Sequence, residues 1–141
     1  MDFQAYNKIL ICKDDMKNVT AGDKVVGYSF KIKYPSYRGA FLSCIEALKF
    51  WVDDEEVPAS SVAFQLKGKE FLLAELPECF KEYWYVREPA TIQVFRDGGL
   101  SAGEHKLRVY MRHRVPYTGY FGEYLVLESD ETEQRILKEV Q

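Results

Sequence analysis

Side chains suited to acid–base or metal chemistry are sparse: the chain has two histidines, His105 and His113, and three cysteines, Cys12, Cys44 and Cys79. No His-x-His or Cys-x-x-Cys spacing joins them, so no metal-ligand set is predicted. His113 falls on the apolar side of an alternating segment, which fits either a hydrogen-bonded core histidine or a ligand or base. His105 follows Gly-Glu and is predicted to be an exposed turn residue. We expect neither a metal site nor a catalytic residue in this chain.

The other residue types that support catalysis do not form a recognisable pattern. The acidic residues at 53–56 crowd one turn, where a solvated loop is a simpler interpretation than a paired acid and base. The serines at 60–61 have no histidine near them, and no Gly-x-Ser-x-Gly sequence is present. Glycines are adjacent only at 98–99, without a following helical pattern, which argues against a phosphate-binding loop.

Basic residues concentrate on one predicted strand. In residues 106–115, apolar residues alternate with Arg108, Arg112 and Arg114. The alternation favours a solvated outer face over a surface for an anionic partner. Residues 123–141 contain six acids and two bases, so the C-terminal part of the chain can neutralise this face.

The composition of the 141-residue chain narrows the class of protein further. A net charge of −3 argues against nucleic-acid binding, and 47% hydrophobic residues argue against disorder. No apolar run approaches the ~20 residues that span a bilayer, and the N-terminal residues lack the pattern of a signal peptide. The odd, widely spaced cysteines indicate free thiols. We therefore expect a single domain, residues 1–141, in the cytoplasm, with no nucleic-acid or membrane partner.

The elements that must position these residues are predicted to be strands, because hydrophobic residues recur with a period of two. Turn residues separate the segments, as at Lys67-Gly68-Lys69. This pattern predicts an all-β fold, a single-domain antiparallel β-sandwich of immunoglobulin-like or jelly-roll-like type. The predicted strands are 24–34, 45–52 and 106–115, with shorter ones at 8–13, 62–66, 70–74, 83–87, 91–96 and 122–127.

Only the C-terminal residues predict a helix. Asp130 is a suitable cap and Glu133 stands three positions later, as in a capping box. Ile136, Leu137 and Val140 would then share one side of a short C-terminal helix.

Two segments at strand ends are rich in tyrosine, proline, glycine and arginine. They are 34–39, Tyr-Pro-Ser-Tyr-Arg-Gly, and 115–122, Val-Pro-Tyr-Thr-Gly-Tyr-Phe-Gly. Tyrosine and arginine supply much of the energy at protein contacts, although a packed corner is the alternative interpretation. We predict that six of these residues lie near one another and form a subunit interface: Tyr34, Tyr37, Arg38, Tyr117, Tyr120 and Phe121.

At these segments the chain resembles the small (beta) subunit of bacterial C-glycoside deglycosidases, over roughly residues 8–120. None of the shared motifs is catalytic, and the chain has Asp53-Asp54 where an Asp-Gly turn is expected. The resemblance rests on the residues at 34–39, Ser43, Val52-Asp53, Val57-Pro58, Gly98-Gly99-Leu100, Gly103-Glu104-His105 and Val115-Pro116-Tyr117.

The resemblance implies a non-catalytic β-sandwich subunit bound to a larger, TIM-barrel alpha subunit that holds a divalent metal, most commonly manganese. It further implies a carbon–carbon lyase whose substrate is a 3-keto sugar joined to an aromatic, flavonoid-type aglycone. A ketone at C3 acidifies the C2 proton, so a base and a metal on the partner can drive β-elimination of the aglycone.

Two other functions remain open from the residues alone. A free-standing carbohydrate-binding β-sandwich would use aromatic platforms, for which Trp51 and Trp84 are the candidates. A small-molecule enzyme in a β-barrel would place His113 inside the barrel.

Overall fold

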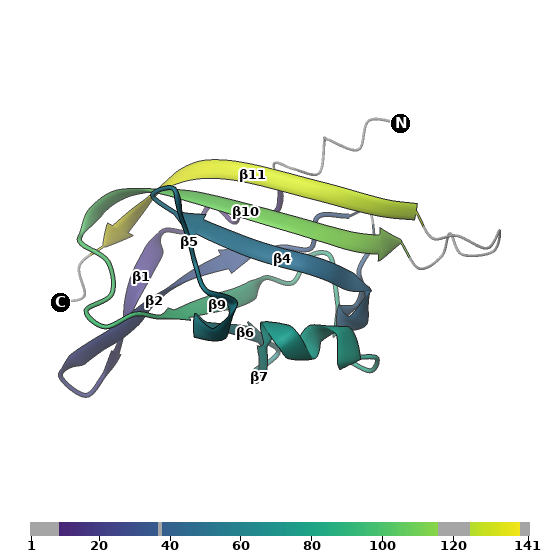
Figure 1. Ribbon diagram of the computed structural model, residues 1–141, viewed down its shortest axis with the longest axis horizontal. Coiled ribbons are helices and arrows are strands. Elements are labelled where there is room, and N and C mark those ends of the chain that lie inside the picture. The colour runs from purple at the N-terminus through teal and green to yellow at the C-terminus, as the bar shows by residue number, and fades with distance from the viewer. Residues whose placement is uncertain (1–8, 37, 116–124, 139–141) are drawn as a thin grey trace.

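A computed structural model describes residues 9–36, 38–115 and 125–138 (Figure 1). In this part of the chain the strands form one large sheet and one two-stranded sheet. Across the large sheet they run β5 (Glu55–Glu56), β4 (Ile45–Val52), β10 (Gly103–Val115), β11 (Leu125–Lys138), β1 (Met16–Ala21), β2 (Lys24–Ile32), β9 (Ala90–Phe95), β6 (Val62–Leu66) and β7 (Lys69–Leu72).

The small sheet and three short 3₁₀ helices lie at one end of this arrangement. The small sheet pairs β3 (Ala40–Phe41) with β8 (Tyr83–Trp84). The 3₁₀ helices are η2 (Leu42–Cys44), η3 (Ala59–Ser61) and η4 (Leu73–Glu78). No helix in the described ranges is long and apolar enough to cross a membrane.

The large sheet curls into a half-barrel, which encloses the core on its concave side (Figure 1). Along β10 every second side chain is buried, from His105 to Val115, because successive residues of a strand point to opposite faces. The largest fully buried side chains of the core are aromatic, and Phe30 packs against Phe50 with ring centroids 5.4 Å apart. The curl lets a single sheet cover its own apolar face.

The segment before β1 links two strands that do not pair directly. The amide of Cys12 donates to the carbonyl oxygen of Lys31 on β2 at 3.0 Å. The amide of Ile11 donates to the carboxylate of Glu131 on β11 at 3.2 Å, and Arg135 Nε donates to the Cys12 carbonyl oxygen at 3.1 Å. These contacts join β2 to β11 beyond the short pairing of β1 with β11.

The all-β prediction is confirmed, and two predicted strands match β4 and β6 residue for residue. The turn chemistry is also confirmed, since Gly68, Gly98 and Gly99 all have positive φ. The remaining boundaries differ modestly. The predicted strand 24–34 ends at residue 32 in the structure, and the predicted strand 106–115 begins at residue 103. The predicted strand 70–74 is observed as 69–72, and 83–87 is observed as 83–84. The predicted strand 91–96 is observed as 90–95.

The strand arrangement differs from the predicted two-sheet antiparallel sandwich. One mixed sheet curls on itself, and β1 runs parallel to β11 through the pair Met16 and Leu137. The predicted strand at 8–13 is a single bridge between Ile11 and Ile32. The polar β1 was not predicted, because its sequence, Met-Lys-Asn-Val-Thr-Ala, does not alternate.

The predicted C-terminal helix is wrong, since residues up to Lys138 belong to β11. Each residue of β10 has a register partner on β11, from Gly103 opposite Leu137 to Val115 opposite Leu125. This long pairing satisfies the backbone and overrides the local preference of the acidic segment for a helix.

Candidate subunit interface

The first predicted interface segment leaves β2 and passes the end of β10. Tyr34 is a buried core residue, with its ring centroid 4.9 Å from that of His113 and 5.3 Å from that of Trp84. Because His113 lies two residues before the end of β10, Tyr34 lies close to the point where the second predicted segment begins. Arg38 is exposed. Outside the described residues lie the other four: Tyr37, Tyr117, Tyr120 and Phe121. The interface role of these residues stays a prediction.

Three aromatic rings and a lysine form a row on the small sheet beside this segment. Phe41 on β3 faces Tyr83 on β8, with a ring-centroid distance of 5.2 Å and a T-shaped arrangement. The ring of Tyr85 follows at 4.7 Å from that of Tyr83. The ammonium of Lys67 lies 4.3 Å from the Tyr85 ring centroid, within cation–π distance. We call Phe41, Tyr83, Tyr85 and Lys67 the aromatic row.

The row forms because strand alternation sorts three successive aromatic residues. Trp84 points into the core, so Tyr83 and Tyr85 point outward. The strands approach closely at Gly39, where a Cβ atom would overlap the carbonyl oxygen of Trp84. Arg38 directly precedes this glycine and therefore lies next to the row. The sequence signal for the row is the triplet Tyr-Trp-Tyr at 83–85, since alternation on a strand places its first and third rings on the same face.

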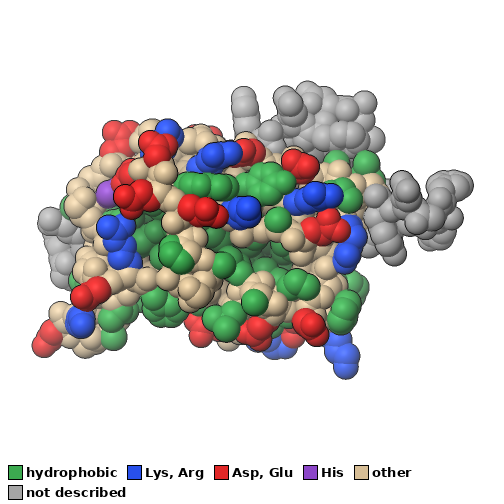
Figure 2. Space-filling view, in the orientation of Figure 1, with side chains coloured by type: hydrophobic (Ala, Val, Ile, Leu, Met, Phe, Trp, Pro, Cys, Tyr) green, Lys and Arg blue, Asp and Glu red, His purple; other side chains and the backbone are tan. Residues whose placement is uncertain are grey.

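Exposed apolar side chains make this end of the molecule suitable for a protein contact. Tyr85 is 57% exposed and Phe41 is 42% exposed. Leu72 at the end of β7 is 52% exposed, and Phe80 on the connection between β7 and β8 is 68% exposed. Figure 2 shows hydrophobic side chains reaching the surface between β4 and η4, among acidic and basic ones. Aromatic residues are enriched at protein–protein interfaces and single exposed ones are ordinary, so the cluster is the informative feature.

The two tryptophans do not act as open aromatic platforms. Trp84 is fully buried, packs against Phe64 at a centroid distance of 5.3 Å, and donates from Nε1 to the Glu88 carbonyl oxygen at 2.7 Å. Trp51 lies on the outer face of β4, where the guanidinium of Arg108 stacks 4.4 Å from its ring. A buried ring and a covered ring leave little flat surface for a sugar.

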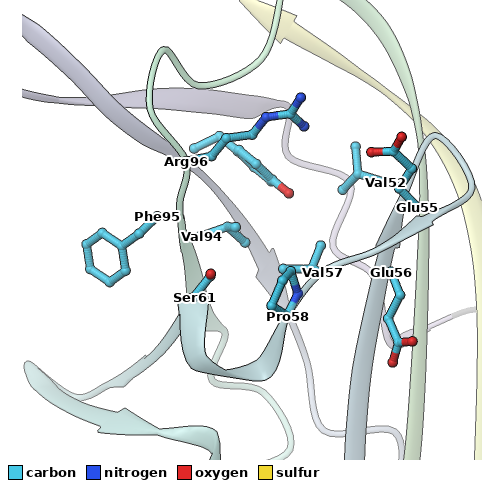
Figure 3. Close-up of a pocket in the computed structure, with 10 residues that line it drawn as sticks. Val52, Glu55, Glu56, Val57, Pro58, Ser61, Val94, Phe95 and Arg96 are labelled. Atoms are coloured by element: carbon cyan, nitrogen blue, oxygen red, sulfur yellow. The ribbon is translucent and has the colours of Figure 1, made fainter.

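An open pocket lies between β4, the turn after it and the end of β9 (Figure 3). Its cavity volume is about 280 Å³. Figure 3 shows Arg96 on one side of the opening and Glu55 on the other. Burial raises the pKa of Tyr28, which also lines it, to about 12, so this phenol remains a hydrogen-bond donor at neutral pH. No histidine or cysteine is among the described residues that line the pocket, and its one serine, Ser61, therefore has no histidine beside it there to act as a base.

The prediction that His105 is exposed is wrong. Because β10 begins at Gly103, His105 falls on its inner face and is buried. Nδ1 donates to the Asp53 carboxylate at 2.6 Å and Nε2 donates to the Ser101 carbonyl oxygen at 2.7 Å. Desolvation opposes the charged ring, but these hydrogen bonds outweigh it and raise the pKa of His105. The pair ties the turn after β4 to β10, which is a structural role.

Of the two interpretations of His113, a hydrogen-bonded core residue or a ligand or base, the structure supports the core position. The expected hydrogen bond is absent among the described residues. The His113 side chain is fully buried, and neither ring nitrogen has a hydrogen-bond partner among the described residues. Burial lowers the pKa of His113 to about 4, so the ring is neutral at pH 7. It packs against Tyr34, with ring centroids 4.9 Å apart, and its burial closes it off from solvent in the part of the chain that the structure describes.

The outer face of β10 is open to solvent, and acidic side chains neutralise the charges of its arginines, as predicted. Arg108 makes two hydrogen bonds with the carboxylate of Asp130 on β11, at 2.9 and 2.7 Å. Arg112 and Arg114 lie 3.1 and 3.7 Å from Glu46 on β4. The acidic C-terminal segment and β4 therefore supply the counter-charges for this face.

The cysteines and carboxylates do not form a ligand set in the described ranges. Cys12, Cys44 and Cys79 are free thiols. No group of three or more histidine, cysteine, aspartate or glutamate side chains in those ranges is placed to hold a metal ion. The donor groups of the described residues therefore do not form a site for a divalent metal of the kind that the resemblance places on the alpha subunit.

Comparison with known proteins gives one consistent result. A family model described as C-glycoside deglycosidase beta subunit matches residues 6–117. The C-glycoside deglycosidase beta subunit of Eubacterium cellulosolvens is 33% identical over 93 residues, which cover 65% of this chain and 63% of that protein. The corresponding subunit of Arthrobacter globiformis is 30% identical over 78 residues, covering 55% of this chain and 59% of that protein.

A longer alignment matches a beta subunit whose name specifies a substrate. The 3'-dehydrocarminate deglycosidase beta subunit of a Microbacterium species is 28% identical over 114 residues, covering 81% of this chain and 86% of that protein. By contrast, the matched region spans less than two thirds of the length of the Eubacterium and Arthrobacter proteins.

Proposed function

Because this chain belongs to the C-glycoside deglycosidase beta subunit family, we propose that it is the non-catalytic partner of a larger alpha subunit. The complex cleaves the carbon–carbon bond between a 3-keto sugar and an aromatic aglycone. The alpha subunit is a TIM barrel that carries the base and a divalent metal. This chain stabilises that subunit by docking on it through the aromatic row.

The aromatic row is the observation that carries this proposal. Phe41 and Tyr85 are exposed, yet the rings are held in place by Tyr83 between them and by Lys67 at the end. Lys67 also donates to the Tyr83 carbonyl oxygen at 2.9 Å. A preordered apolar surface loses little conformational entropy on binding, which favours a protein partner.

The chemistry of the chain supports placing the reaction on the partner. His105 is occupied by Asp53 and Ser101, and His113 is sealed in the core. Neither histidine can act as a base toward a bound sugar. The three free thiols support our proposal that the complex resides in the reducing cytoplasm.

The carbohydrate-binding alternative has weaker support, because its two candidate platforms are not open. Trp84 is buried and Trp51 is covered by Arg108. The pocket near Arg96 can accept polar groups, but it does not present an aromatic face comparable to the aromatic row.

The test is to purify this chain with and without the alpha subunit and to assay cleavage of a 3-keto C-glycoside. We expect cleavage only when the alpha subunit is present and a stable complex in gel filtration. Cleavage by this chain alone, or the absence of any complex, would contradict the proposal.

The contribution of the aromatic row is tested by the double variant Phe41→Ala/Tyr85→Ala. Loss of two central aromatic anchors weakens binding of the alpha subunit by about 30-fold or more. Phe95→Ala is the matched control, because Phe95 is a comparably exposed aromatic residue, 48% exposed, on β9 beside the pocket. Equal affinities for the two variants, with both correctly folded, would show that the row is not the docking surface.

A further inference from the structure

A second surface feature adjoins the aromatic row on the other side of the turn that follows Tyr85. It is an open groove between the segment before β1 and residues 87–89, with a cavity volume of about 550 Å³. Residues of both charge and apolar type line it: Ile9, Ile11, Cys12, Lys13, Asp14, Lys33, Arg87 and Pro89. We call this feature the basic groove.

The rim of the basic groove carries positive charge that no ion pair among the described residues neutralises. Lys13, Lys33 and Arg87 form no ion pair within the described ranges. The single acid on the rim, Asp14, lies 3.5 Å from Lys31, which is not part of the groove lining. Three cations around one groove, none of them in an ion pair with a described residue, are notable in a chain whose net charge is −3.

Apolar side chains contribute to the lining of the groove, and backbone hydrogen bonds hold the two segments that form it. Ile9, which is 40% exposed, and Pro89 are among the lining residues. One wall is held by the amide of Lys33, which donates to the Leu10 carbonyl oxygen at 2.9 Å. The other wall is a turn in which the Glu88 amide donates to the Tyr85 carbonyl oxygen at 3.0 Å. The groove therefore exists before any partner binds.

The same turn connects the groove to the aromatic row. Tyr85 ends the row, and Arg87 on the groove rim lies two residues later. The indole of Trp84 fixes the turn from below through its hydrogen bond to the Glu88 carbonyl oxygen at 2.7 Å. A partner seated on the row thus extends naturally over the groove.

We infer that the basic groove holds an acidic segment of the alpha subunit that also inserts an apolar side chain. This inference rests on the proposed function and extends its interface. Carboxylates of the segment pair with Lys13, Lys33 and Arg87, and its apolar side chain covers Ile9 and Pro89. Charge complementarity of this kind accelerates association and sets the orientation of the partner.

Charge reversal tests the inference directly. Arg87→Glu should weaken binding of the alpha subunit by about tenfold or more, mainly through slower association. Lys49→Glu is the matched control, since Lys49 is exposed on β4 and lies outside the groove. We expect that variant to bind within threefold of the wild type. Affinity is measured by surface plasmon resonance at 50 and 300 mM salt.

The salt dependence separates this inference from the proposed function. The wild type should bind less tightly at high salt, and Lys33→Glu/Arg87→Glu should lose most of that dependence. If both groove variants bind like the wild type while Phe41→Ala/Tyr85→Ala binds weakly, the groove inference is wrong and the proposed function stands. If the wild type binds no alpha subunit, the proposed function itself fails. If the groove variants leave that affinity unchanged but abolish binding of benzoate to the free chain, the groove is a small-anion site and the inference is overturned.

Discussion

The two ends of β10 place the same type of side chain in opposite environments. At one end, His105 donates to Asp53 and Ser101 at 2.6 and 2.7 Å. At the other end, His113 packs against Tyr34 and has no hydrogen-bond partner in the part of the chain that the structure describes. Desolvation is outweighed by hydrogen bonds at the first end, so the pKa of His105 is raised. Burial alone lowers the pKa of His113 to about 4.

The difference shows that position on a strand does not determine the role of a histidine. Both residues point to the inner face, because they lie eight positions apart on a strand whose buried residues alternate throughout. At the end near Asp53 the carboxylate is half exposed and supplies a counter-charge, so this end, which we call the hydrated end, can hold an imidazolium. The end near Tyr34 is buried and aromatic, and Trp84 links it to the small sheet; we call it the dry end.

The largest expected loss of stability comes from removing a large buried side chain at the dry end. Trp84→Ala removes ring contacts with Tyr34 and Phe64 and the hydrogen bond to Glu88, so we expect a loss of about 3–5 kcal/mol in the free energy of unfolding. Trp51→Ala on the outer face should cost about 1 kcal/mol, because only a half-buried cation–π contact is lost. Urea unfolding followed by circular dichroism measures both. Equal losses would refute the contrast between core and outer face.

Lowering the pH should lower the free energy of unfolding, because His113 is buried in its neutral form at the dry end. An unfolded histidine binds a proton below its ordinary pKa of 6.5, whereas the folded one does so only below about 4. The unfolded state therefore binds more protons in this window, and stability falls as the pH falls through it. Relative to His113→Phe, the wild type should lose about 2 kcal/mol between pH 7 and pH 5. His105→Gln should retain this loss, and parallel curves for the wild type and His113→Phe would contradict the prediction.

Glu131 lies on β11 opposite Val109, midway along β10. Its contribution to the free energy of unfolding should depend on pH in the opposite direction to that of His113. Burial raises the pKa of Glu131 from 4.5 to about 7, so the folded state keeps a proton that the unfolded state releases. Stability is therefore lost as the pH rises through this window. Compared with Glu131→Gln, the wild type should lose about 1–2 kcal/mol between pH 5 and pH 8. Identical profiles in urea unfolding would show that the carboxyl is solvated.

The smallest effect is expected at the hydrated end. Asp53→Asn tolerates the positive φ of 51° at this position and removes the charge that faces His105. Because the raised pKa of His105 stabilises the fold below pH 6.5 and this contribution fades as the pH rises, the variant should lose about 0.5–1 kcal/mol at pH 6 and nearly nothing at pH 9. A chemical-shift titration of His105 should show its pKa lowered in the variant. An unchanged histidine pKa would mean that Asp53 is not its partner in solution.

The predictable parts of the fold are those that depend on local order. The alternation in residues 45–52 and 62–66 predicted β4 and β6 with correct ends, because a strand with one buried face needs an apolar residue at every second position. The glycines at 68 and 98–99 marked turns for an equally local reason, their tolerance of positive φ. The arginines of β10 were assigned to its outer face on the same basis.

The errors occur where distant segments determine the outcome. Residues 130–138 carry a helix-like sequence but form β11, since pairing along the whole of β10 outweighs local propensity. His105 was assigned to an exposed turn, although its ring is clamped by Asp53 from the end of another strand. The aromatic row joins Phe41 to Tyr83 and Tyr85, whose separation along the chain conceals their contact.

By itself the sequence determined that this is an all-β protein of the C-glycoside deglycosidase beta subunit family, because alternation and short motifs are properties of residue order. The tertiary structure alone decided the order of strands in one curled mixed sheet, the opposite environments of the two histidines, and the surfaces formed by the aromatic row and the basic groove. These features arise when residues far apart in the chain share burial, charge and hydrogen bonds. Such sharing depends on three-dimensional contact, which a linear pattern does not encode.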